Sequence, residues 1–260
     1  MVSPTKNKFG KSEKKDISIS PIDLYNPALI LASRSITVRI RIKTKWSNKV
    51  REVSVEETVS VLAFNCWKIG MQTLLEIENE NFQIDTQQQR IAIIEEIVAL
   101  LIHSLDRMVH ETIDDEDRAT LIQLYAQKMA DHVQDNARDF SGNGDYRTPF
   151  YEKLNERFAG YANTKWDSER NQAGFSMGRE FANNIIGTLG SRDKKWALDY
   201  LQQVLLPDFF ALYLKTVKSV GLIEDDGKGS KLDAQHHLIT DKEEQVKNVS
   251  TPRYKVADKE

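Results

Sequence analysis

The densest set of side chains that could bind a ligand is a basic run near the N-terminus. Between residues 34 and 51, arginines and lysines accumulate before the first acidic residue of the segment, and a tryptophan lies among them. Such a patch attracts phosphate groups because binding releases counterions, and an exposed aromatic ring stacks on a base. No known base-reading motif accompanies the run, and a solvated outer face of a β-hairpin explains it equally simply. The candidate anion or nucleic-acid contacts are Arg39, Arg41, Lys43, Lys45 and Trp46.

Histidines and carboxylates are the next candidates, as metal ligands. Di-iron helical bundles use Glu-x-x-His pairs that point into the core, and the sequence contains no such pair. His103 and His110 share one side of a predicted helix with Glu96. That side is opposite the apolar stripe of the helix, so we expect it to face solvent or a partner. These patterns predict no metal site.

The single cysteine, Cys66, lies within an apolar helical run. One cysteine cannot form an intramolecular disulfide or a cysteine-based zinc site, and an apolar setting disfavours its reactive thiolate. No G-x-S-x-G nucleophile elbow occurs either. We therefore predict no catalytic residue and no cofactor, and we expect a reducing, cytoplasmic compartment.

Small residues recur in the stretch from 171 to 206. Residues 187–195 superficially look like a phosphate loop, but the Walker spacing and the preceding strand are missing. Gly174, Gly178 and Ala182 recur every four residues in a helix predicted from Gln172. Small residues at that spacing leave a shallow groove where another backbone can approach. We expect the groove to seat a helix of the same domain or, alternatively, a partner protein or a second copy.

Composition places the chain among ordinary globular proteins. Its 260 residues are 40% apolar and 29% charged, with a formal net charge of −3. A nearly balanced charge gives no global attraction to nucleic acid or to anionic membranes. The longest apolar run, residues 59–75, is interrupted by Asn65, Lys68 and Gln72, so we predict no membrane span.

The N-terminal part of the chain lacks helical periodicity. Residues 1–20 are rich in Lys, Ser and Thr and are predicted to be a disordered basic arm. Two prolines, Pro21 and Pro27, oppose a helix, so we expect residues 21–33 to be extended or irregular and to lie across another element. From residue 36 apolar and polar side chains alternate strictly, which predicts a β-hairpin. Residues 21–56 are thus predicted to be an irregular segment followed by the hairpin.

The remainder is predicted to be helical over residues 57–223. Its first helix, 59–81, is apolar nearly all round in its first half, which is typical of a central, buried helix. The next helix is the clearest amphipathic one, and the glycine-rich loop at 141–148 is a candidate sub-boundary. Residues 224–260 are predicted to be a disordered tail.

These patterns predict a mainly α protein, a multi-helix bundle with a short N-terminal β-hairpin and disordered termini. We expect a non-enzymatic cytoplasmic interaction protein, an adaptor, assembly or regulatory factor that binds a protein partner or forms a homo-oligomer through a helical surface. One alternative is a nucleic-acid-associated protein that uses the basic hairpin 34–51. The other is a helical enzyme or ligand-binding bundle with a pocket among four aromatic residues: Trp166, Phe175, Phe181 and Trp196.

Overall fold

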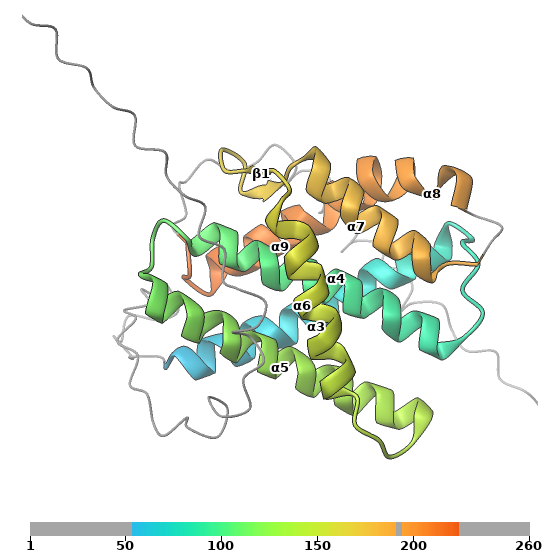
Figure 1. The fold of residues 1–260 in the computed structure, drawn as a ribbon, viewed down its shortest axis with the longest axis horizontal. Helices are drawn as coiled ribbons and strands as arrows, with labels where there is room; N and C mark the ends of the chain where they lie inside the picture. The colour runs from blue at the N-terminus through green and yellow to red at the C-terminus, as the bar shows by residue number, and fades with distance from the viewer. Residues whose placement is uncertain (1–53, 191–193, 224–260) are drawn as a thin grey trace, which may run out of the picture. The chain divides into compact units, whose positions relative to one another are not determined.

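The structure is a computed structural model that describes residues 54–190 and 194–223. Within these residues the chain is mainly helical, which confirms the predicted class (Figure 1). The predicted basic arm, the hairpin and most of the predicted tail lie outside the described residues. The chain divides into two compact units, Met1–Leu222 and Ile223–Glu260. The helices described below belong to the first unit.

Helices α3 and α4 both begin at a capping box. Helix α3 spans Val55–Asn79, and the Ser54 side chain accepts a hydrogen bond from the backbone N–H of Glu57. Helix α4 spans Gln87–Val109 and begins in the same way at Thr86 and Gln89. In each box the side chain at the third helical position also bonds back to the cap residue, so two N–H groups without helical partners are satisfied.

Helix α4 is the central helix of the unit. It packs against α3, against α5 (Asp115–Ser141), against α6 (Arg147–Ala162) and against α7 (Phe175–Thr188). From residue 93 to 109 almost every side chain of α4 is buried, on all sides of the helix. The prediction that the helix at 59–81 is the fully buried one was wrong, because α3 has neighbours on one side only. Figure 1 shows α6 running steeply across α4 and α5.

Helix α5 begins where the acidic cluster predicted it. The Asp114 side chain accepts hydrogen bonds from the N–H groups of Glu116 and Asp117. The loop after α5 is held against that helix by Gln134, whose amide bonds the carbonyl of Gly144 and the N–H of Tyr146. Residues 141–148 and the helices on either side of them therefore fall within the same compact unit.

A small hairpin separates α6 from α7. Strands β1 (Trp166–Asp167) and β2 (Gln172–Ala173) are antiparallel, with Trp166 opposite Ala173. The predicted helix from Gln172 therefore starts later, at Phe175, because the residues before it pair as a strand. Helix α7 is followed by α8 (Lys194–Tyr200).

The last helical segment contains a π-helix. Residues Leu201–Leu205 form η1, and α9 follows directly as Leu206–Ser219. Pro207 lies in the first turn of α9, where its missing N–H is tolerated. The predicted division at Pro207 thus takes the form of a change in helix type, not a break in the chain. Deeper in the core, the Tyr213 hydroxyl donates a 2.7 Å hydrogen bond to the carbonyl of Leu101 and ties α9 to α4.

Candidate functional site

One side of α3 carries a row of large apolar side chains that no described element covers. Four of them, spaced with Lys68 at alternating intervals of three and four residues, lie on a single side of the helix. We call this row the α3 stripe: Val61, Phe64, Lys68, Met71 and Leu75. The exposed fractions of its four apolar residues are 52%, 56%, 46% and 56%, in chain order. The remaining exposed large apolar residues are distributed one each over α5, α7, α8 and η1.

The opposite side of α3 already supplies the core. Leu62, Cys66 and Ile69 are buried there, and α3 packs against α4, α5 and α9. Burying that side therefore does not require the α3 stripe. The stripe had a signal in the sequence, its three-and-four spacing, but a helix that is apolar on two sides does not reveal which side the fold covers.

The charges along the stripe follow a simple order. Lys68 is at the centre, with its Nζ 5.9 Å from the centre of the Phe64 ring, a cation–π arrangement. Both ends are acidic, with residues 56 and 57 at one end and Glu76 and Glu80 at the other. Pairing the stripe with a second copy, in either direction, would bring lysine to lysine and acidic end to acidic end. Like charges placed opposite each other are unfavourable, so this surface disfavours self-association.

The small residues predicted to form a groove lie against this same chain. A Cβ atom added to Gly178 would lie 2.7 Å from Cδ2 of Leu206, so the start of α9 packs directly on the α7 backbone. Gly174 lies outside the helix, contrary to the prediction, and its N–H donates to the carbonyl of Lys165 at 3.0 Å. Ala182 is fully buried in α7.

A cavity of about 290 Å³ opens beside these two glycines. The side chains around it are apolar or amides, and the Gln202 amide donates to the carbonyl of Phe175 at 3.0 Å. No titratable side chain lines it among the residues that the structure describes, so it offers no acid, base or nucleophile. The lining residues are Gln172, Ala173, Gly174, Phe175, Gly178, Gln202, Gln203, Leu206, Pro207 and Phe210.

The four aromatic residues expected to share a pocket do not converge. Only Phe175 lines the cavity. Trp166 packs near Phe210 with ring centres 6.2 Å apart, and Phe181 is fully buried. Trp196 stacks on Phe82 with ring centres 4.6 Å apart. The ligand-binding alternative therefore loses the constellation on which it was based.

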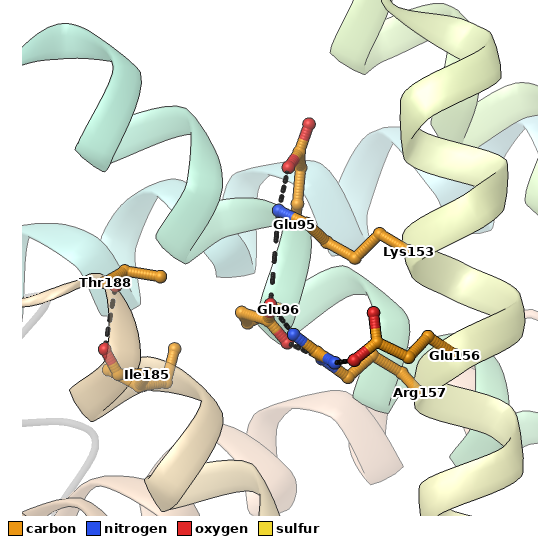
Figure 2. A network of polar contacts seen from close by, with 7 residues as sticks. All are labelled: Glu95, Glu96, Lys153, Glu156, Arg157, Ile185 and Thr188. Atoms are coloured by element: carbon orange, nitrogen blue, oxygen red, sulfur yellow. Dashed lines mark hydrogen bonds and ion pairs between the residues drawn. The ribbon is translucent and has the colours of Figure 1, made fainter.

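A network of charged side chains joins α4 to α6 (Figure 2). The Glu96 carboxylate, 1% exposed, accepts hydrogen bonds from Arg157 Nε at 2.6 Å and Nη2 at 2.9 Å. Lys153 pairs with Glu95, and Glu156 pairs with Arg157 at 2.8 Å. Each carboxylate of the network thus has a cation, and such saturated ion pairs hold helices together but leave no carboxylate ready to transfer a proton.

His103 lies fully buried on the same helix. Its Nε2 accepts a 3.4 Å hydrogen bond from Arg107 Nε, and its ring packs edge-on against Phe158. Burial, and secondarily the neighbouring Arg107 charge, lower the pKa of His103 to about 3, so the imidazole is neutral. The expectation that Glu96 and His103 face solvent or a partner was wrong, because α6 covers that side of α4 and supplies a cation for Glu96.

The remaining candidates have no visible chemistry. Burial raises the pKa of Cys66 to about 12, with Tyr125 acting in the opposite direction, so the thiol stays protonated. Across residues 54–190 and 194–223, no three metal-ligating side chains come together and no helix is long and apolar enough to cross a membrane. The basic residues of the hairpin lie outside these ranges, and nucleic-acid binding there stays a prediction.

The fold and surfaces on their own describe a helical protein with an exposed apolar row and no assembled catalytic group among its described residues. Comparison with protein-family models, with curated proteins and with solved structures found no match.

Proposed function

We propose that this chain is a non-enzymatic interaction protein, an adaptor, assembly or regulatory factor, which binds a partner protein through the α3 stripe. The observation that carries the proposal is the half-exposed apolar row on one side of a well-capped helix. Fully burying one such side chain is worth about 1.5–3 kcal/mol, so covering four half-exposed ones is worth about 3–6 kcal/mol before the costs of association.

The charges along the row specify the chemistry of the partner. A complementary segment presents apolar side chains in a row, a carboxylate near the middle to pair with Lys68, and basic residues toward its ends. Docking an amphipathic segment onto an exposed helix in this way is a common mode of protein recognition. The self-repulsion described above favours a different protein over a second copy.

Two further observations support an interaction protein over an enzyme. The cavity beside Gly178 lacks titratable side chains among the described residues, and the charged groups around Glu96 are already paired. Cys66 is buried and protonated. General acid–base and nucleophilic catalysis both need a group that can exchange a proton or attack at neutral pH.

The test compares a stripe variant with a matched control. Proteins captured by the wild-type chain from a lysate of its source cells are purified, and their dissociation constants are measured. For F64S/L75S we expect at least about a tenfold loss of affinity, equivalent to 1.4 kcal/mol. The control F175S removes an equally exposed aromatic ring from another surface and should bind as the wild type does.

Circular dichroism and thermal unfolding confirm that all three proteins are folded. If every captured partner binds the wild type, the stripe variant and the control with equal affinity, the α3 stripe is not the docking surface.

A further inference from the structure

We propose that residues 21–33 of the same chain occupy the α3 stripe when no partner is bound, with the Asp23 carboxylate against the Lys68 ammonium. This contact regulates the surface described above and therefore rests on the proposed function. The partner would have to displace a segment that imitates it.

The charge pattern of this segment matches the stripe. Asp23 is the only charged residue from 17 to 33, and apolar side chains lie on both sides of it. Arg34 follows at one end, and at the other end Lys14 and Lys15 outnumber the single acid beside them, Asp16. The stripe has the opposite order, with a lysine at its centre and acidic residues at both ends. Complementary charges of this kind select one partner and set its register.

The length of the segment is sufficient. From Val61 to Leu75 the stripe extends 14 residues along α3, or about 21 Å at the helical rise. About seven residues of extended chain cover that distance, and Pro21 and Pro27 favour an extended form. The run Ala28–Ala32 is uninterrupted and apolar, and it would otherwise expose its side chains to water.

The connection to α3 permits the contact. Twenty residues lie between Ser33 and Ser54, the residue that caps α3. Extended, they span about 70 Å, whereas Leu75 lies only about 32 Å along the helix from Ser54. A tether of this kind keeps the segment at an effective concentration of about 1 mM, so even a weak intrinsic affinity of about 100 µM would fill the stripe roughly ten times in eleven.

Other parts of the chain fit the stripe less well. The alternating run at 36–43 places Arg39, Arg41 and Lys43 beside its apolar residues, and these would meet Lys68 with like charge. Residues 224–260 contain no apolar run comparable to Ala28–Ala32, and charged residues interrupt them throughout. Residues 21–33 therefore combine the apolar content and the single central acid that the surface requires.

The direct test is zero-length cross-linking of the purified full chain. A carbodiimide joins a carboxylate and an amine that are in contact, forming an amide while the reagent takes up the water. We expect peptide mass spectrometry of the monomer fraction to find Asp23 joined to Lys68. A mixture of isotope-labelled and unlabelled chains shows whether the link is within one chain; a link exclusively between chains makes a second copy the occupant and overturns the inference.

A second measurement follows the cover itself. In D23N the pairing charge is lost, so we expect several-fold stronger binding of a hydrophobic fluorescent dye, which F64S/L75S should abolish. D16N is the matched control and should behave as the wild type. The charge exchange D23K/K68D should return dye binding to the wild-type level. Absence of the Asp23–Lys68 link, or unchanged dye binding in D23N, overturns the inference.

These outcomes separate the two proposals. If F64S/L75S weakens partner binding but Asp23 does not cross-link to Lys68, the stripe is a docking surface without this internal cover. If the cross-link forms but no partner loses affinity for F64S/L75S, residues 21–33 are a permanent part of the fold and the proposed function fails.

Discussion

Replacing His103 by glutamine should remove a large part of the acid sensitivity of the fold. His103 is fully buried, and in the part of the chain that the structure describes its Nδ1 has no hydrogen-bond partner. Its Nε2 is occupied by the Arg107 donor. A second ring proton would therefore meet the Arg107 cation without any compensating carboxylate, whereas glutamine stays neutral across the whole pH range.

The size of the effect follows from the two pKa values. The pKa of His103 is about 3 in the folded protein and about 6.5 in the unfolded chain. Between these values the unfolded state binds more protons, so the stability of the fold falls as the pH falls from about 6.5 toward 3. At pH 4.5 the loss is about 3 kcal/mol relative to pH 7.5, and it approaches about 5 kcal/mol near pH 3.

Urea unfolding at pH 7.5 and at pH 4.5 measures this effect. The change in unfolding free energy between the two pH values should be about 3 kcal/mol smaller in His103→Gln than in the wild type, whatever the substitution costs at neutral pH. Phe158→Leu loosens the same contact without removing a titrating group, so its pH dependence should match the wild type. Equal pH dependence in wild type and His103→Gln would refute a neutral, buried His103.

Three other properties of the core can be tested. Asp106 and Arg118 form a buried 2.7 Å ion pair, so D106N should lower the unfolding free energy by about 3–5 kcal/mol, measured by urea unfolding, whereas an equal cost for an exposed pair would contradict this. Gly178→Leu should cost about 1–3 kcal/mol because Leu206 fills that space, while Gly187→Ala, with no atom within 4 Å of the added Cβ, should gain up to about 1 kcal/mol in thermal unfolding. Cys66 should resist a thiol reagent at pH 8 until the protein unfolds, and rapid labelling of the native protein would show that the thiol is accessible.

The sequence by itself determined the class of the fold and several helix starts. Thr86 and the acidic cluster at 114–117 mark the beginnings of α4 and α5, because caps act over a few residues and need no distant partner. The same local signals were misleading near Gly174, where the pairing of Gln172 and Ala173 with β1 replaced the first turn of the predicted helix.

Only the tertiary structure decided which helix surfaces are covered. Helix α3 is apolar on two sides, and the fold covers one of them, leaving Phe64 and Leu75 exposed. Helix α4 has a polar side that appeared suited to solvent, but Arg157 on α6 neutralises Glu96 and allows that side to be buried. Hydrophobic periodicity records the preference of each helix for burial; which preferences are met depends on neighbours contributed by residues far away in the chain.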